Sequence, residues 1–333
     1  MLKKIIYCMS LVFILIFSGG KAFAEATGAN FSVAPVLPEN QIEDVSYFSL
    51  SPIFNQAQKI DVTVYNSSTK DVTVTCDVAN ATTNDNGMPN YQITDKKRDS
   101  SLKLGFSDIA HVIEPTITLK SGENKKVTVE INYPNQLNGT MLGGLTFKEI
   151  TEKNSKNKGV TNRYLYSIAV KINGEISTEK KSIKLNEVIP EQRNYRNYIH
   201  ANLQNPTSSI IKKLDVKATV TNEKSGTTYK SESTNLKMAP NSNFNYGISL
   251  GETALKPGKY KIEITGSADG KAFLFKKNFD ITNETAKQLN KNAIITKEKN
   301  PIKEKLFYIL LAAVIIINII IGVKIWITRK NRK

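Results

Sequence analysis

Lys59-Ile60-Asp61-Val62-Thr63-Val64-Tyr65 decides the fold class of this chain, because apolar and polar residues alternate along it. Alternation at every second position is the period of a strand with one buried face. The same pattern returns at residues 71–78, 115–119, 125–133, 163–172, 198–203, 214–220, 259–264 and 272–281. Clusters of Asn, Ser, Gly and Pro separate these runs, and no amphipathic helix lies between them. The pattern predicts an all-β protein made of antiparallel sandwiches.

The chain has 333 residues, which fits about two such domains. A polar stretch at residues 151–159 has no apolar residue to bury, and we place the boundary there. We therefore expect a first β-sandwich at residues 25–152 and a second at residues 160–282. Residues 283–305 are polar and rich in Lys, and Pro301 interrupts any helix, so we expect a stalk.

Both ends of the chain are apolar. Residues 1–24 combine Lys3 and Lys4 with a short apolar run and an Ala-x-Ala site, which is typical of a cleaved signal peptide. Residues 306–327 are long enough to cross a bilayer as a helix, and residues 328–333 form a basic tail. Positive flanks stay inside. We expect a single-pass cell-membrane protein with its ectodomain outside facing the wall, its C-terminus cytoplasmic and its helix in the lipid bilayer.

The cysteine content and the charge indicate the type of organism and the class of partner. Only Cys76 remains after cleavage, so the exported part can form no internal disulfide, which favours a bacterium with a thick wall. Of the net charge of +16, residues 25–150 contribute about −5 and residues 151–280 about +10, and the two ends and the stalk carry the rest. Such a basic surface suits anionic lipid heads or a wall polymer, or is simply solvated. Nucleic acid is excluded as a partner by the expected location outside the cell.

Some stretches resemble catalytic or metal-binding motifs, but each lacks residues that the motif needs. Residues 247–251 match the G-x-S-x-G elbow, but His111 and His200 both precede Ser249, whereas that fold needs a later His. Residues 82–87 resemble half of a calcium loop that lacks carboxylates at both ends. Two His and one exported Cys are too few for a typical zinc site. We expect a protein without enzymatic activity, metal or cofactor.

Ten stretches, in their order along the chain, resemble one protein family. They are residues 31–33, 35–41, 47–48, 80–87, 107–109 and 142–145 in the first half, and 194–197, 201–206, 238–244 and 255–260 in the second. Together they resemble the WxL-interacting proteins of Gram-positive bacteria over nearly the whole chain. The resemblance implies two immunoglobulin-like sandwiches, the first for peptidoglycan and the second for host proteins. It also implies exported WxL-domain proteins as partners at the cell surface.

The resemblance identifies no contact residues, so we choose candidates from the chemistry of their side chains. One candidate is a polar segment whose side chains suit sugar hydroxyls or peptide amides of the wall, or a loop that bonds to its own backbone: Asn80, Thr82, Thr83, Asn84 and Asp85.

Two further candidates come from small and from large side chains. Gly143 and Gly144 permit a ligand to approach the backbone closely, or mark a bulge or tight bend. The second half offers a mixture of cations and aromatic rings, which favours a contact hot spot or packing over the sheet: Arg193, Tyr195, Arg196 and Tyr198.

These observations predict a surface protein that acts by binding. It would tether peptidoglycan and exported WxL-domain proteins and bind host proteins, with several weak contacts on one chain raising their effective concentration. A partner strand added to a sheet edge is a plausible docking mode. Two other classes stay open: an export chaperone or assembly factor for surface proteins, and a wall-modifying enzyme.

Overall fold

The structure, a computed structural model, describes residues 29–150, 164–176, 180–295, 312 and 316. The predicted signal peptide, cytoplasmic tail and, apart from Ala312 and Ile316, transmembrane helix lie outside the described residues. Among the residues that are described, no helix is long and apolar enough to cross a membrane. The chain divides into two compact units, the first comprising Met1–Thr82 and Pro89–Glu179 and the second Thr83–Met88 and Lys180–Lys333.

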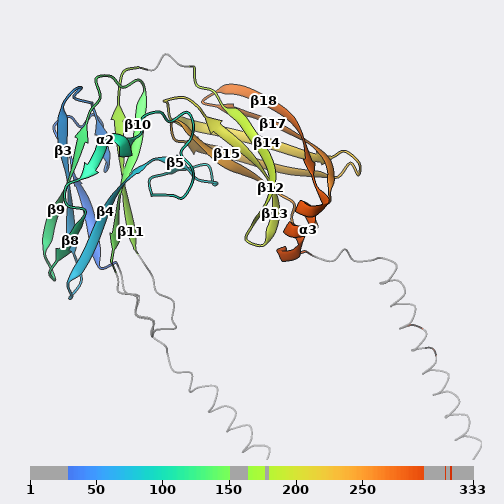
Figure 1. Cartoon of the computed structure of the whole chain (residues 1–333), viewed down its shortest axis with the longest axis horizontal. Helices are drawn as coiled ribbons and strands as arrows, with labels where there is room; N and C mark the ends of the chain where they lie inside the picture. Colours follow the sequence, from blue (N-terminus) through green and yellow to red (C-terminus); the bar gives the residue numbers. More distant parts are fainter. Residues whose placement is uncertain (1–28, 151–163, 177–179, 296–311, 313–315, 317–333) are drawn as a thin grey trace, which may run out of the picture. The chain divides into compact units, whose positions relative to one another are not determined.

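The first unit has two main sheets (Figure 1). One runs in the order β1 (Phe31–Val36), β3 (Ala57–Asn66), β9 (Asn124–Asn132) and β7 (Ala110–Val112). The other runs in the order β2 (Phe48–Leu50), β11 (Leu165–Asn173), β10 (Thr140–Glu149), β4 (Val72–Asn80) and β8 (Thr116–Leu119). The strands pair antiparallel, except that β2 runs parallel to β11. Smaller elements are β5 (Thr82–Thr83), β6 (Pro89–Asn90) and α2 (Phe106–Ile109).

Alternation along the strands builds the core of the first unit. In β3, Ile60, Val62 and Val64 are buried, while Asp61 and Thr63 on the opposite face are half-buried. Burying each such apolar side chain contributes about 1.5–3 kcal/mol. Cys76 belongs to the same core, and its burial raises the pKa of the thiol to about 12, with a smaller contribution from the charge of Asp77. Cys76 therefore packs as a small apolar residue rather than a reactive thiol.

The second unit also has two sheets (Figure 1). One runs in the order β12 (Lys184–Arg193), β13 (Arg196–Asn205) and β16 (Ser242–Ser249). The other runs in the order β15 (Thr228–Met238), β14 (Ile211–Asn222), β17 (Gly258–Ala268) and β18 (Lys271–Ile281). Inward side chains from both sheets, including Ile199, Leu203, Val220 and Ile262, form one buried cluster. The all-β class predicted from alternation is confirmed.

The stalk prediction is wrong for residues 283–292, which form helix α3 (Asn283–Asn292). The hydroxyl of Thr282 caps its first turn by accepting a hydrogen bond from Thr285 N. Ala286 is buried, and the side chain of Asn290 both accepts from Leu255 N and donates to Leu255 O. The low hydrophobicity of the segment does not indicate a helix, but Ala286, Leu289 and Asn290 attach this helix to the second unit. Residues 296–305 of the predicted stalk lie outside the described residues.

The predicted boundary at residues 151–159 differs from the division into units that the structure has. Strand β11, expected in the second sandwich, pairs with β10 and β2 and belongs to the first unit. Its Ile168, Val170 and Ile172 are buried in the first core. A polar stretch marks a connection between strands, whether or not a domain ends there. The segment Thr83–Met88 differs in the opposite direction, since it lies within the predicted first sandwich and belongs to the second unit.

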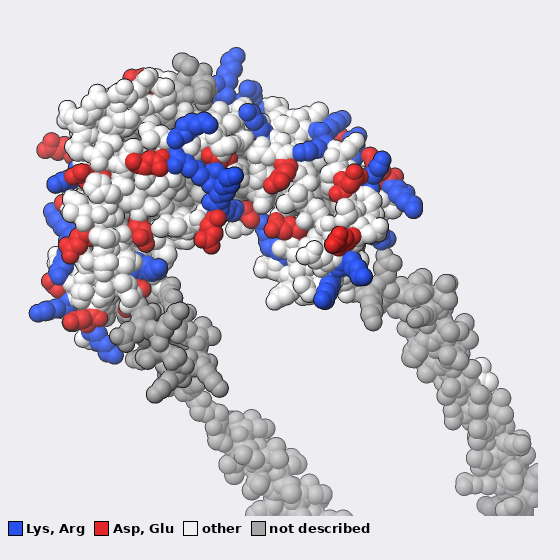
Figure 2. Space-filling model, viewed as in Figure 1, with Lys and Arg blue, Asp and Glu red and all other residues white. Residues whose placement is uncertain are grey.

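Charged side chains of both signs are interspersed on the face seen in Figure 2. In the second unit, several lysines pair with neighbouring acids: Lys213 with Asp215, Lys217 with Glu232, and Lys276 with Glu263. The excess of positive charge predicted for residues 151–280 is therefore partly offset locally, rather than forming a field of one sign.

Candidate functional site

A cavity of about 220 Å³ opens in the second unit beside strand β16. Asp85 and Asn86 reach it from the segment Thr83–Met88, Arg193 from the end of β12, Ser233 and Leu236 from β15, and Phe244, Tyr246 and Gly247 from β16. Strands β15 and β16 are end strands of the two sheets. The cavity therefore lies where the two sheets of the second unit are open at the side, and polar and apolar groups share its wall.

The segment Thr83–Met88 is held in the second unit by backbone and side-chain bonds. The buried Thr83 hydroxyl accepts from Ala239 N at 3.0 Å and lies 2.6 Å from the hydroxyl of Ser242. Lys237 N donates to Gly87 O at 2.6 Å. Asn84 closes the turn on itself, since its side-chain oxygen accepts from Asn86 N and Met88 N. Asn84 thus has the structural role that the sequence left open.

Asp85 connects this segment to strands β12 and β16 of the three-stranded sheet. Arg193 Nη2 donates to its carboxylate at 2.9 Å, and Asn245 N of β16 donates at 3.4 Å. The Arg193 guanidinium carbon lies 5.6 Å from the ring centre of Tyr198, within the range of a cation–π contact. The structure therefore brings together three candidates, Asp85, Arg193 and Tyr198, that the sequence placed in two separate groups.

His200 lies beside the same cavity. It is the strand partner of Gly247, is 3% exposed, and has its Nδ1 2.5 Å from Glu191 Oε2. A carboxylate only accepts, so Nδ1 carries the proton of the neutral ring, and Nε2 is buried without a partner among the described residues. Burial lowers the pKa of His200, the bond to Glu191 opposes this, and the charges of Arg193 and Asp85 contribute less.

Two candidates of the predicted polar segment lie elsewhere. Asn80 caps helix α2, since its side-chain oxygen accepts from Ser107 N at 2.9 Å and its nitrogen donates to the Ser107 hydroxyl at 2.8 Å. Thr82 begins β5 and is half-buried. Neither lines the cavity.

The two glycines of β10 make room for aromatic side chains. A Cβ added at Gly143 would lie 2.1 Å from Phe106 Cδ1, and one at Gly144 would lie 2.5 Å from Tyr91 Cβ. Neither pairing of β10 has a shift in register at these residues. In this structure, the ring of Phe106 and the Cβ and backbone of Tyr91 occupy the space that a ligand would need.

Tyr195 and Arg196 lie at the turn between β12 and β13. Tyr195 adopts a φ of 59° and is 66% exposed, and its carbonyl accepts from Ile294 N at 2.7 Å. Arg196 pairs with Glu252 at 3.3 Å. Both residues are outside the lining of the cavity. Sequence reasoning missed Ser233, Leu236, Phe244 and Tyr246, because alternation marks them only as strand residues and nothing in a single sequence identifies the open side of a sandwich.

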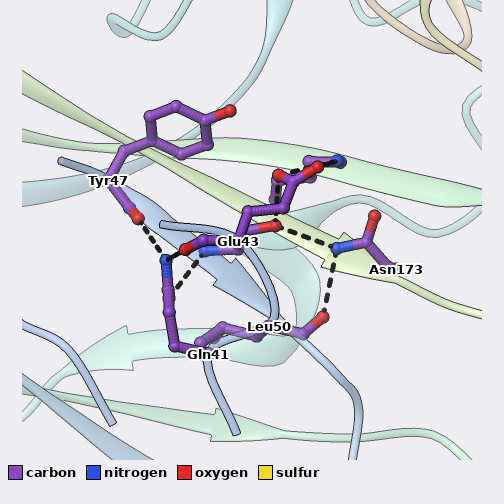
Figure 3. Close-up of polar contacts among 7 residues, drawn as sticks. Gln41, Glu43, Tyr47, Leu50 and Asn173 are labelled. Carbon is purple, nitrogen blue, oxygen red and sulfur yellow. Dashed lines mark hydrogen bonds and ion pairs between the residues drawn. The ribbon is translucent and has the colours of Figure 1, made fainter. Parts of the chain in front are cut away.

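The first unit has an ordered polar network between β2 and β11 (Figure 3). Gln41 Nε2 donates to the carbonyls of Glu43 and Tyr47, both at 2.9 Å, and its oxygen accepts from Ser49 N. Lys171 Nζ donates to the Glu43 carboxylate at 2.9 Å, and the buried Ser49 hydroxyl donates to it at 2.7 Å. Lys171 of β11 neutralises the Glu43 carboxylate. The hydrogen bonds of the network hold the short parallel strand β2 against β11.

No group of three or more His, Cys, Asp and Glu side chains in the part of the chain that the structure describes is arranged to hold a metal ion. The bonds found at the cavity are hydrogen bonds, an ion pair and ring contacts.

Comparisons with known proteins match both halves of the chain to one family. Residues 31–149 match the peptidoglycan binding domain of the WxL Interacting Protein family, and residues 155–291 match its host binding domain. The second match begins before β11, which strand pairing assigns to the first unit. We assign β11 to the first unit, because it forms hydrogen bonds with β10 and its side chains are buried in the first core. No curated protein matched the chain.

Solved structures resemble the chain only remotely. The chaperone–tip adhesin complex of CFA/I fimbriae is 12% identical at a TM-score of 0.31, over 75% of this chain and 99% of that one. The CsuC–CsuE complex of Acinetobacter baumannii Csu pili is 15% identical at 0.33, over 74% and 98%. The E. coli chaperone DraB is 14% identical at 0.26, over 75% and 96%. At these scores the likeness carries no functional argument. The two family matches do identify the chain, which belongs to the WxL-interacting protein family and has a binding role at the cell surface.

Proposed function

We propose that the protein is a membrane-anchored tether in which the first unit binds peptidoglycan, the second binds host proteins, and the chain also holds exported WxL-domain proteins at the surface. The observation that carries this proposal is the succession of a peptidoglycan binding and a host binding domain in one chain. The apolar residues 306–327 support a lipid anchor and residues 1–24 support export. We regard each unit, with two sheets around one core, as an immunoglobulin-like sandwich.

Tethering requires no single strong site. A chain fixed at one end and bound to the wall along its length holds a second ligand at a raised local concentration, so weak contacts suffice. The recognition chemistry of the cavity in the second unit fits such a role. We therefore propose no catalytic step and no cofactor.

Pelleting with purified sacculi tests the wall-binding part. The full chain, purified in mild detergent, is mixed with sacculi or with cellulose particles in low and in high salt. We expect the chain to pellet with sacculi in both salts and to stay in solution with cellulose. Equal pelleting with cellulose would mean non-specific adsorption, and loss of binding in high salt would mean that charge alone holds the chain. Either result would contradict a peptidoglycan site.

A further inference from the structure

The edge of β16 that faces away from β13 and the cavity beside it form a groove, and we propose that an extended segment of the protein partner binds there as an added strand. This inference rests on the proposed function, because it says where and how the second unit holds its protein ligand. Strand addition supplies main-chain hydrogen bonds along an edge and a pocket for a side chain.

The register of β16 defines which of its groups face outward. Leu250 N donates to Asn197 O at 3.0 Å, so the pair next to the strand is hydrogen-bonded to β13. Antiparallel pairing alternates, which turns the backbone groups of Asn243, Asn245, Gly247 and Ser249 away from β13. Asn245 N indeed donates to Asp85, and Gly247 O accepts from the Ser231 hydroxyl.

The four end strands of the second unit differ in how they are protected. Strand β12 contains Pro190 and a register shift, and β15 has two register shifts and charged residues. Strand β18 carries four charged lysine and aspartate side chains along its length. Charges, Pro and bulges are the usual defences of an edge against pairing. Strand β16, with the sequence Ser242-Asn-Phe-Asn-Tyr-Gly-Ile-Ser249, has no charge, no Pro and no shift.

A segment of this chain already uses part of the groove. Thr83–Met88 bonds to the backbone of Lys237, Ala239 and Asn245, and its Asp85 occupies the outward amide of β16. The open cavity continues from Asp85 along the strand to Gly247. Backbone N–H groups on this side of the second unit thus already bind a peptide segment. The cavity extends beyond that segment to Gly247.

The cavity selects the side chain of the incoming segment. Leu236 and Phe244 are the apolar residues of its lining, while Ser233, Tyr246 and Arg193 are polar and already bond to one another or to neighbours within the unit. About 220 Å³ is room for one side chain of medium to large size. The occupant is therefore an extended peptide that presents one residue with an apolar body and a polar end.

Replacing Gly247 with Pro tests the inference. Pro removes an outward N–H, leaves the hydrogen bonds to β13 in place and is tolerated on edge strands, and its Cβ would lie 3.2 Å from Tyr198 Cδ1. Leu274→Pro on β18 is the matched control. Ala268 and Lys271 flank a two-residue turn and form a hydrogen-bonded pair, so Leu274 also points its N–H outward. Ser233→Trp is a second variant that fills the cavity without changing the backbone.

The probe is a display library of random nine-residue peptides, selected on the full chain. We expect selected peptides to bind Gly247→Pro and Ser233→Trp at least about tenfold more weakly than wild type, and Leu274→Pro equally well. Thermal unfolding of each variant establishes that it is folded. Failure to select peptides, or equal binding to all variants, would overturn the inference. So would a wild type that self-associates through β16 and binds no peptide.

Retention of the full chain on immobilised extracellular matrix proteins tests the groove and the proposed host binding separately. If wild type and Gly247→Pro are retained equally, the groove is not the site and the proposed function stands. If wild type is not retained, host binding itself fails, whatever the peptides do.

Discussion

The carboxylate of Asp85 accepts a hydrogen bond from Arg193 Nη2 at 2.9 Å, although 108 residues of chain separate the two. Asp85 lies between two strands of the first unit in sequence and is nevertheless part of the second. The cavity beside β16 is therefore incomplete without a segment outside the matched host binding domain, which begins at residue 155. Residues from both matched ranges therefore line one cavity.

Asp85→Ala should lower the free energy of unfolding of the second unit by about 1 kcal/mol, because it removes an ion pair of intermediate exposure and a bond to the amide of Asn245. Thermal unfolding of the full chain measures the change. Glu252→Ala is the control, since it removes the more exposed pair with Arg196 and should cost less. Equal effects of the two variants would mean that Asp85 contributes nothing beyond an ordinary surface charge.

Gly143→Ala should destabilise the first unit by about 1–3 kcal/mol, because the added methyl group meets the ring of Phe106. The same measurement applies, with Gly226→Ala as the control. Gly226 has a φ of 67° and open space around it, so the control reports backbone strain alone, about 1 kcal/mol. A fully stable Gly143→Ala protein would contradict the packing role assigned to this glycine.

Acid should destabilise the second unit through His200. Its pKa in the folded state is lowered from 6.5, so below about pH 6.5 the unfolded chain binds the proton more readily. The free energy of unfolding then falls with decreasing pH, by at most about 1.4 kcal/mol per pH unit, until the folded-state pKa is passed. The facing groups are Glu191, Arg193 and Asp85.

Urea unfolding at pH 7.5, 6.5 and 5.5 measures this dependence. The comparison is between wild type and His200→Gln, because the carboxylates contribute to both. We expect the variant to lose stability less steeply between pH 6.5 and 5.5. Identical slopes for the two proteins would show that His200 does not titrate differently on folding.

A fragment that ends at residue 152 should not fold, whereas one that ends at residue 179 should. The shorter fragment lacks β11, and with it three buried aliphatic side chains worth about 1.5–3 kcal/mol each: Ile168, Val170 and Ile172. It also leaves β2 without a partner strand and exposes the edge of β10 that faces β11, although β10 still pairs with β4. Circular dichroism during heating distinguishes the two cases. Cooperative unfolding of the shorter fragment would contradict the assignment of β11 to the first unit.

The sequence predicts the strands well, because alternation reports directly on which face of a strand is buried, as in Ile60, Val62 and Val64. It misplaces β11, because the same alternation says nothing about which sheet a strand joins. Helix α3 escapes prediction because only Ala286 and Leu289 form its apolar face, and the bonds of Asn290 that complete the attachment cannot be read from sequence. Asp85 and Arg193 are both predicted as contact residues, but only the fold brings them together.

We propose that one chain binds the wall and a protein partner at the same time. Capture of fluorescent sacculi on a surface coated with extracellular matrix proteins, with and without the full chain, tests this simultaneous binding. We expect the chain to capture sacculi in a dose-dependent way and a large excess of chain to reduce capture again, because each ligand is then saturated separately. Sacculi that remain in solution at every concentration, although the chain binds each surface alone, would contradict it.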